Sequence, residues 1–208
     1  ITNSNTFPKF IFSRNANASL NHGGGAHGYV GHVLFPSEDG KVWALGRNEE
    51  GVLGLGLDPN TDVNKYTLVS ALGGVANIVA SSTTGGSGYD RQGTILLDDT
   101  GNVWTCGRNA NGQLGHDDTK QRNVPTLVTT NIYNVSITEV ASVGSGNLVL
   151  DSTGQIWGAG YNADYRLGDL SGSTATLNST FIPSMPTDSP TFTSIDGPAN
   201  SGLALDST

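Results

Sequence analysis

An internal repeat is the feature that most constrains what this chain can fold into. Three segments superpose without a gap, and each carries a glycine, a Val-Trp or Ile-Trp pair, a second glycine, an asparagine and a Leu-Gly pair at matching positions. The three tryptophans of the chain all occupy one position of this repeat: Trp43, Trp104 and Trp157. Self-similarity at a fixed period indicates an architecture in which each unit buries its apolar face against its neighbours.

Other stretches recur with the same period. An apolar run precedes the first glycine of the repeat, as in Thr94–Asp98 and Asn147–Asp151, and a further copy occupies Gly202–Asp206. Another strand is expected to start near four residues that are 58, 59 and 58 positions apart: Pro8, Tyr66, Pro125 and Pro183. This period is close to the length of a four-stranded propeller blade. We therefore predict an all-β chain that forms a β-propeller of four-stranded blades.

Each part of the repeat unit has an expected structural role. In Leu96–Trp104, two β-prone runs flank a polar turn that contains a glycine, so this segment is expected to form a tight hairpin. The second glycine should end the tryptophan strand, at Gly46, Gly107 and Gly160. The leucine of the following turn should pack in the core between blades, at Leu53, Leu114 and Leu167. We expect the tryptophans to fill this core with buried indoles.

The repeat resembles a known family. The pattern Gly-x-Val-Trp-x-x-Gly-x-Asn-x-x-Gly-x-Leu-Gly, followed by Val-Pro-x-Leu-Val, is similar to the regulator of chromosome condensation repeat, and the middle unit, Thr94–Val128, matches it most fully. The first unit departs from the pattern at Tyr66, where proline is usual, and the third has Tyr165 where the others have Gly51 and Gly112. The resemblance implies a β-propeller, usually of seven blades.

About three and a half repeats are present, all in one propeller domain. Residues 1–66 hold a partial blade and the first repeat, 67–124 the second, 125–182 the third, and 183–208 the start of a fourth. Seven blades of about 58 residues would need roughly 400 residues, and a propeller leaves only short, protected strand edges. We therefore expect a fragment of a longer protein, in which the remaining blades of the same chain or a neighbouring subunit cover the strand at Leu203–Leu205.

Composition limits the classes of partner. Ten Lys and Arg residues against 18 Asp and Glu residues give a formal net charge of −8, which disfavours nonspecific binding to nucleic acid. No window approaches the roughly 20 apolar residues needed to cross a bilayer, so membrane insertion is not expected. The only cysteine, Cys106, excludes an intramolecular disulfide and a multi-cysteine zinc site, and we interpret it as a small core residue.

The resemblance implies binding rather than catalysis. Members of the family include a nucleotide exchange factor for a small GTPase, a plant UV-B photoreceptor and a secreted inhibitor of β-lactamase, and most bind proteins through propeller loops. The photoreceptor function is excluded because it needs additional clustered tryptophans, whereas this chain has only one per repeat. Fold alone does not choose among the other functions.

Two function hypotheses remain. The low content of charged residues, 13%, and the 29 glycines are typical of virion fibres and secreted adhesins. The first hypothesis is therefore a non-enzymatic binding or structural module that recognises a protein or cell-surface receptor in an extracellular or virion appendage such as a tail fibre. The alternative is an intracellular, cytoplasmic adaptor or guanine-nucleotide exchange factor of the same repeat family.

No catalytic, metal or cofactor site is predicted. Histidines at intervals of five, His22, His27 and His32, could indicate a zinc or nickel site, but this spacing along a strand puts successive residues on opposite faces, and a glycine-rich loop is the better interpretation. The segment Asp58–Asp62 imitates the start of a calcium loop, but it lacks the required glycine and glutamate. The acidic pairs Asp98–Asp99 and Asp117–Asp118 lie in predicted turns, where aspartate commonly bonds to its own backbone.

The candidate binding residues lie in three loops that break the repeat, His22–His32, Thr83–Arg91 and Tyr161–Arg166. Tyrosine and arginine are the residue types that dominate protein interfaces, which makes these loops candidates for contact with a partner. Ordinary exposed loops are the alternative interpretation. The candidates are His22, His27, His32, Tyr89, Arg91, Tyr161, Tyr165 and Arg166.

Overall fold

The computed structural model describes residues 32–37, 39–59, 61–72, 77–83, 93–163, 165–168, 176–185, 190–197 and 202–207. Within these ranges the regular secondary structure is β-strand apart from two single-turn 3-10 helices, η1 (Glu49–Gly51) and η2 (Ser70–Leu72). No helix in the described part is long and apolar enough to cross a membrane.

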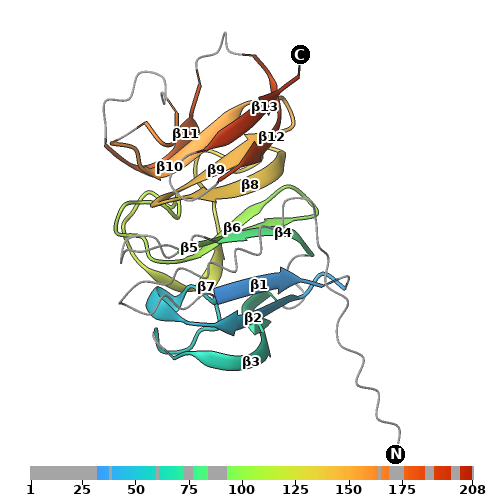
Figure 1. Cartoon of the computed structure of the whole chain (residues 1–208), viewed down its shortest axis with the longest axis vertical. Coiled ribbons are helices and arrows are strands. Elements are labelled where there is room, and N and C mark those ends of the chain that lie inside the picture. Colours follow the sequence, from blue (N-terminus) through green and yellow to red (C-terminus); the bar gives the residue numbers. More distant parts are fainter. Residues whose placement is uncertain are drawn as a thin grey trace, which may run out of the picture.

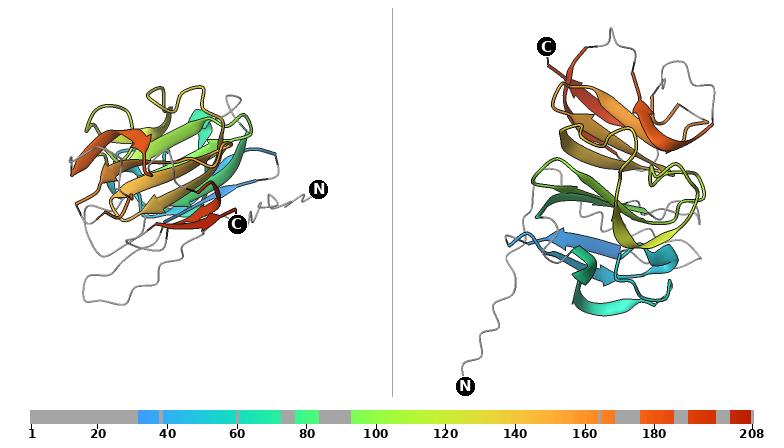
Figure 2. Two further views of the ribbon diagram at one scale, coloured as in Figure 1. Left: turned by 90° about the horizontal axis from the view of Figure 1, so that it is seen from above. Right: turned by 180° about the vertical axis from the view of Figure 1, so that it is seen from behind.

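The strands form antiparallel sheets that follow the order of the chain. The first blade contains β1 (His32–Pro36), β2 (Val42–Gly46) and β3 (Val63–Leu68). The second contains β4 (Ile78–Thr83), β5 (Gly93–Asp98), β6 (Val103–Gly107) and β7 (Arg122–Leu127), and the third contains β8 (Ile137–Val143), β9 (Gly146–Asp151), β10 (Ile156–Tyr161) and β11 (Leu177–Pro183). A last hairpin pairs β12 (Phe192–Asp196) with β13 (Leu203–Asp206). The predicted four-stranded blade is therefore confirmed in the second and third units, and Figures 1 and 2 show the sheets stacked one after another.

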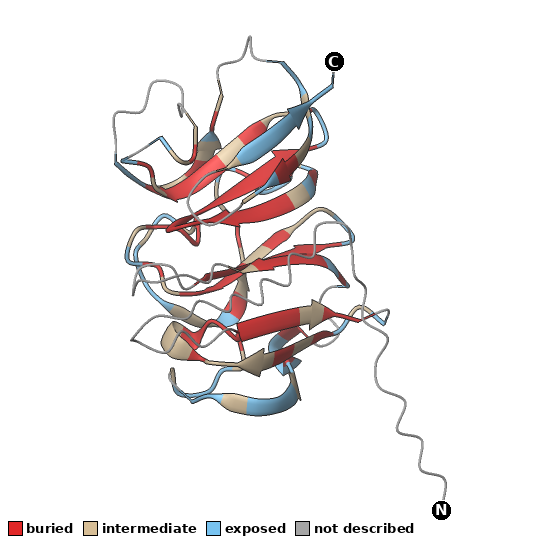
Figure 3. Ribbon diagram, viewed as in Figure 1, coloured by how far each residue is buried: buried red, intermediate tan, exposed pale blue. Residues whose placement is uncertain are grey.

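The apolar core lies between successive blades. Leu53 of the first blade packs in one cluster with Leu96 of the second, and Leu167 of the third blade packs with Ile195 of the last hairpin. The leucine at this repeat position is buried in each blade, with 0%, 0% and 1% of Leu53, Leu114 and Leu167 exposed. Figure 3 shows that buried residues concentrate in the central strands, whereas β3 and β13 are largely exposed.

The same asparagine closes the turn that carries this leucine in all three blades. The side-chain oxygen of Asn48 accepts a hydrogen bond from the amide of Leu53 at 3.1 Å. Asn109 and Asn162 do the same for Leu114 and Leu167, each at 2.9 Å. The repeated asparagine therefore satisfies a buried backbone donor that the turn leaves without a strand partner.

The tryptophans are only partly buried, so the prediction of buried indoles was wrong. The ring of Trp104 packs against the core cluster of the first two blades, and that of Trp157 packs against the cluster of the second and third blades. The indole N–H of Trp104 instead reaches the carboxylate of Asp98 at 3.0 Å, and that of Trp157 reaches Asp151 at 2.9 Å. A tryptophan needs a partner for its N–H, and the hairpin aspartate supplies one near the edge of the core.

The last strand of each blade does not start at the residue that we expected from the sequence. Tyr66 and Pro125 lie inside β3 and β7, Pro183 is the final residue of β11, and Pro8 lies outside the described residues. These strands form sheet edges with partly exposed faces, so their residues lack the alternation that marks a half-buried strand. Proline is tolerated there because an edge strand has amides that need no partner.

The strand β13 has little cover in the described structure. Leu203 and Leu205 are 58% and 65% exposed, although the corresponding strands β5 and β9 are buried throughout. This strand pairs only with β12 among the described strands. The expectation was that further blades or a neighbouring subunit cover Leu203–Leu205, and it stays a prediction.

Candidate protein-interaction surface

Each of the first three blades carries a turn after its tryptophan strand, and the three turns share one backbone conformation. The residue three positions after the repeated asparagine has a left-handed φ of +73° at Gly51, +74° at Gly112 and +54° at Tyr165. Its amide donates to the carbonyl of Asn48, Asn109 or Asn162 at 3.0, 3.0 and 3.1 Å. Positive φ favours glycine, so Tyr165 occupies a position that disfavours a side chain.

The first two turns hold the last strand of the following blade. The amide of Gly56 donates to the carbonyl of Asn123 in β7 at 2.8 Å, and the amide of Asp117 donates to the carbonyl of Ser179 in β11 at 2.8 Å. In the first turn, the side-chain amide of Asn123 also donates to the carbonyl of Leu57 at 3.2 Å. These two turns are therefore joints between blades.

The third turn has a different chemical character. Tyr161 stands where the first two blades have Arg47 and Arg108, and the guanidinium of Arg166 lies over its ring, 5.1 Å from the ring centre. The neighbouring Tyr165 is 74% exposed. Leu177 pairs with Tyr161 across β10 and β11 and is 47% exposed. We call Tyr161, Tyr165, Arg166 and Leu177 the third-turn patch.

At the corresponding positions, the first two blades have ion pairs. Arg47 is paired with Glu49 at 3.3 Å, and Arg108 is paired with Glu50 of the preceding blade at 3.0 Å. In the third blade, Tyr161 occupies the position of these arginines. The nearby arginine is Arg166, in the turn, and its guanidinium stacks on the Tyr161 ring. Two exposed apolar side chains beside a cation–π pair form a surface of the composition found at protein-binding hot spots.

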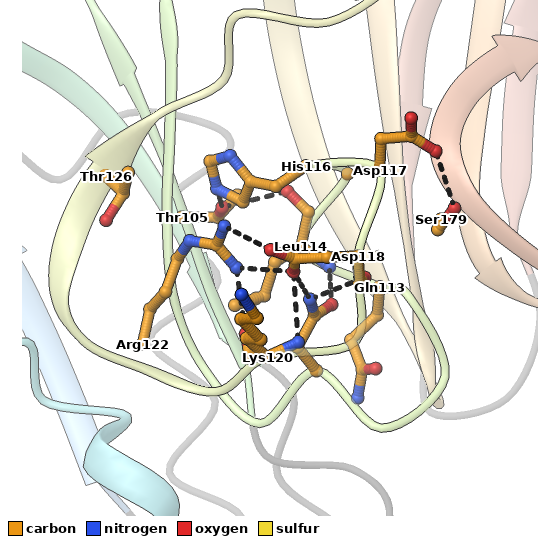
Figure 4. Close-up of polar contacts among 12 residues, drawn as sticks. Thr105, Gln113, Leu114, His116, Asp117, Asp118, Lys120, Arg122, Thr126 and Ser179 are labelled. Atoms are coloured by element: carbon orange, nitrogen blue, oxygen red, sulfur yellow. Dashed lines mark hydrogen bonds and ion pairs between the residues drawn. The ribbon is translucent and has the colours of Figure 1, made fainter.

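A second polar cluster lies in the second blade (Figure 4). The guanidinium of Arg122 donates to both carboxylate oxygens of Asp118, at 3.0 and 3.1 Å, and lowers the pKa of that carboxyl to about 2. Asp118 also accepts a bond from the side chain of Asn109 at 3.0 Å. This cluster braces the turn against the start of β7, because Asn109 in turn holds the amide of Leu114.

Thr105 and His116 form a hydroxyl–imidazole pair in the same cluster. The Thr105 hydroxyl donates to the carbonyl of Leu114 at 2.9 Å, and the Nε2 atom of His116 lies 2.9 Å from the same hydroxyl. A threonine hydroxyl has one proton, so we assign Nε2 as the donor to Thr105. Burial and then the charge of Arg122 lower the pKa of His116 to about 4, so the ring is neutral near pH 7. The imidazole therefore does not accept the Thr105 proton, as a nucleophile–base pair would require.

The predicted site residues separate into three groups. Tyr161, Tyr165 and Arg166 come together in the third-turn patch. His32 is 7% exposed and lies in β1 rather than in a surface loop, and burial lowers its pKa to about 4. The others, His22, His27, Tyr89 and Arg91, lie outside the described residues.

The acidic candidates serve turns and blade joints. Asp62 accepts a hydrogen bond from the amide of Asn48 at 3.1 Å. Asp98 accepts five hydrogen bonds within its own hairpin, from Thr100, Asn102 and Trp104. In the described part of the chain, no group of three or more His, Cys, Asp or Glu residues is arranged to hold a metal ion.

Sequence reasoning missed Leu177. Its exposed side chain extends the patch onto β11, and the signal that could have located it is its place on the strand that pairs with β10, opposite Tyr161. The antiparallel register between the two strands includes a bulge, so the pairing could not be counted from the repeat alone.

Comparison with known proteins identifies the repeat. Residues 100–150 match the family model of the regulator of chromosome condensation (RCC1) repeat. These blades form an RCC1-type β-propeller. Among related proteins, Protein RCC2 of Mus musculus is 30% identical over 137 residues, which is 66% of this chain and 24% of that protein. The X-linked retinitis pigmentosa GTPase regulator of Homo sapiens is 27% identical over 137 residues, 66% of this chain and 12% of that protein.

Solved structures show the same RCC1-type architecture. Human WBSCR16 superposes with a TM-score of 0.71 at 18% identity, over 85% of this chain and 42% of that one. Prp20p from Saccharomyces cerevisiae, whose structure was described with its binding properties to Gsp1p and histones, superposes with a TM-score of 0.65 at 16% identity, again over 85% and 42%. The chain thus spans about a quarter of the length of RCC2 and less than half of these propellers.

Proposed function

We propose that this chain is the protein-binding part of an intracellular RCC1-type adaptor or guanine-nucleotide exchange factor, and that its partner is a small GTPase. The observation that carries the proposal is the third-turn patch, in which Arg166 is stacked on Tyr161 beside Tyr165 and Leu177. Tyrosine and arginine clustered on a rigid turn are what a protein-binding surface requires.

The similar proteins support a GTPase as partner. One relative carries the name of a GTPase regulator, and one structural neighbour was described with its binding to Gsp1p and histones. The net charge of −8 favours a protein partner over nucleic acid. The geometry of Thr105 and His116 also favours binding over nucleophilic catalysis, because the hydroxyl proton is bonded to a carbonyl.

A receptor-binding module of an extracellular or virion appendage is the second candidate. Its support is the composition, with 29 glycines and 13% charged residues. The similar proteins favour the intracellular function, since one relative is named a GTPase regulator and the neighbouring yeast propeller was described with Gsp1p, histones and Kap60. Immunolocalisation in the source cells separates the two candidates.

The test is a direct binding measurement with purified components. The chain is immobilised and exposed to Gsp1p in its GDP-bound, GTP-bound and nucleotide-free states, with serum albumin as the control protein. We expect saturable binding that is tightest for the nucleotide-free state if the chain has exchange activity, and equal for all states if it is an adaptor. Absence of saturable binding to every state would refute the proposal.

A further inference from the structure

We propose that Asn111 is a deamidation site that the joint between the second and third blades controls. In the closed joint, the turn holds Asn111 and Gly112 in a conformation that cannot cyclise. When the joint opens, Asn111 converts to isoaspartate, and a turn that contains isoaspartate cannot close the joint again. The inference is independent of which partner the protein binds.

The first step is the chemistry of the sequence at this turn. Asn111 and Gly112 form the only Asn-Gly pair in the chain. The backbone nitrogen of the glycine can attack the side-chain carbonyl carbon of the asparagine, because glycine has no Cβ to obstruct the approach. The new N–C bond closes a succinimide ring, and ammonia leaves. Water then opens the ring to aspartate or to isoaspartate, in which the main chain runs through Cβ and Cγ.

The second step is that the joint itself requires this glycine. The φ of Gly112 is +74°, and a Cβ atom there would lie 2.5 Å from the Ser179 Cα in β11. At the position of Asn111, the first and third turns have Glu50 and Asp164. Only the second turn therefore combines a required glycine with a preceding asparagine.

The third step is that the closed turn restrains both reacting residues. The amide of Gly112, which carries the attacking nitrogen, donates to the carbonyl of Asn109 at 3.0 Å. The amide of Asn111 donates to the side-chain oxygen of Gln113 at 2.9 Å. Cyclisation requires the nitrogen to lose its proton and to approach the side-chain carbon to about 3 Å. A hydrogen-bonded amide in a fixed turn meets neither requirement.

The fourth step is that this restraint depends on the third blade. Gln113 is 3% exposed, and its carbonyl accepts a 2.8 Å bond from the side-chain amide of Asn147 in β9. Val52 and Arg166 occupy the position of Gln113 in the other two turns, and neither side chain can accept a bond from a backbone amide. The glutamine thus occurs in the turn that carries the Asn-Gly pair, and the neighbouring blade holds it in place.

The rate of modification follows from the opening of the joint. When a reaction needs an open form and the joint opens and closes quickly, the observed rate is the rate of the open form multiplied by its population. The open turn has no third blade against it, so it should react as a free peptide does. Deamidation of Asn111 therefore measures how often the joint between the second and third blades is open.

The last step is the effect of the product on the joint. Isoaspartate at position 111 lengthens the main chain by one carbon atom before Gly112. In the closed joint, Gly112 lies against the backbone of Ser179, and its carbonyl accepts a 3.0 Å bond from the amide of Gly115. A longer main chain cannot keep both contacts. Conversion of Asn111 therefore makes the opening of the joint irreversible.

The experiment follows deamidation of the purified chain at pH 8 and 37 °C by mass spectrometry of the tryptic peptide Asn109–Lys120. Fragmentation of this peptide locates the changed residue, and the free peptide of the same sequence gives the rate without a joint. We expect Asn111 of the folded chain to react at least about 20-fold more slowly than the free peptide. In 6 M guanidinium, the chain should react at the rate of the peptide.

Two glutamine variants test the restraint. Gln113→Leu removes the acceptor of the Asn111 amide, and we expect deamidation to be at least about fivefold faster than in wild type. The control is Gln121→Leu, at an exposed glutamine outside the turn, and its rate should not change. If Gln113→Leu does not fold, wild type in increasing guanidinium provides the second measurement. Its deamidation should accelerate at concentrations below those at which tryptophan fluorescence reports global unfolding.

Each outcome decides one part of the inference. Reaction of native Asn111 at the rate of the free peptide overturns the control by the joint, and absence of reaction in guanidinium overturns the site. Equal rates in the two glutamine variants overturn the role of Gln113. Acceleration in guanidinium that appears only together with global unfolding also overturns the control by the joint.

A final comparison tests the effect of isoaspartate. The isoaspartate form is purified and compared with Asn111→Asp, which has the same charge and a main chain of ordinary length. We expect the backbone amides of β11 to exchange hydrogen at least about tenfold faster in the isoaspartate form, and at the wild-type rate in Asn111→Asp. Equal exchange in the two forms overturns the irreversible opening.

Discussion

The indole N–H of Trp104 donates a 3.0 Å hydrogen bond to the carboxylate of Asp98, which lies on the other strand of the same hairpin, across the turn. The same contact recurs in the next blade, between Trp157 and Asp151 at 2.9 Å. The carboxylate of Asp98 also accepts bonds from Thr100 and Asn102. One buried aspartate therefore fixes both the turn of the hairpin and the orientation of the repeated tryptophan.

Removing this carboxylate should destabilise the second blade. In Asp98→Ala, the amides of Thr100 and Asn102 and the indole N–H lose their acceptor, so we expect the free energy of unfolding to fall by about 3 kcal/mol. The measurement is urea unfolding followed by tryptophan fluorescence. The control is the exposed neighbour in Asp99→Ala, which should lose less than about 1 kcal/mol. Equal losses for the two variants would contradict this role.

The first blade lacks the aspartate and should gain stability when it is restored. Ser37 stands at the position of Asp98, and the indole nitrogen of Trp43 is buried without a hydrogen-bond partner among the described residues. The double variant Ser37→Asp with Asp39→Thr reproduces the hairpin of the second blade. We expect thermal and urea unfolding to show a gain of about 1 kcal/mol. A gain that persists when Trp43 is also replaced by phenylalanine would show that the indole bond is not its source.

Stability should fall as the pH is lowered from 7 towards 4. Burial lowers the pKa of His116, with a further contribution from Arg122, from its usual 6.5 to about 4, and burial lowers that of His32 equally. Between these two values the unfolded chain binds protons that the folded chain does not, so protonation favours unfolding. The measurement is the free energy of unfolding in urea at pH 7.0, 5.5 and 4.5.

A matched variant isolates the contribution of His116. His116→Gln retains a side-chain donor for Thr105 but does not titrate, so its stability should depend less on pH over the same range than that of the wild type. Identical pH profiles for the two proteins would contradict the lowered pKa of His116. His32 should account for the dependence that the variant retains.

The thiol of Cys106 should react only when the protein unfolds. Its side chain is fully buried, and burial raises its pKa to about 12, so neither access nor thiolate is available in the native state. We expect alkylation by iodoacetamide at pH 8 to be at least about 100-fold slower than in 6 M guanidinium. Fast labelling of the native chain would show that the joint between the first two blades opens locally.

Glycine and tyrosine at the equivalent turn positions should respond in opposite ways to substitution. A Cβ at Gly112 would lie 2.5 Å from the Ser179 Cα, so Gly112→Ala should cost more than about 2 kcal/mol, through backbone displacement and the left-handed φ. Tyr165→Gly should be neutral or stabilising by about 1 kcal/mol, because it relieves the same conformation without creating a clash. Calorimetric unfolding of both variants provides the comparison. A loss of stability in Tyr165→Gly would contradict this prediction, because it would show that the tyrosine ring stabilises the fold.

Sequence and structure agree most closely where the repeat is strongest. Gly101 at a hairpin turn with a φ of +85°, the asparagine of each turn and the buried leucine after it could be predicted, because each satisfies a local requirement that recurs in every unit. The last strands could not be placed, since β3 and β7 are partly exposed edges without an apolar period. The partial burial of Trp104 was missed because its bond to Asp98 depends on the packing of the whole hairpin.

By itself, the sequence determined that the chain forms four-stranded propeller blades and that Tyr165 departs from the repeat. Those conclusions depend on local conformational preferences and on periodic burial, both of which are encoded in each unit. Only the tertiary structure showed why the other two blades have glycine at the position of Tyr165. The glycine position is restrictive because Asn123 and Ser179 approach it from 72 and 67 residues further along the chain, and no local pattern reports a contact at that separation.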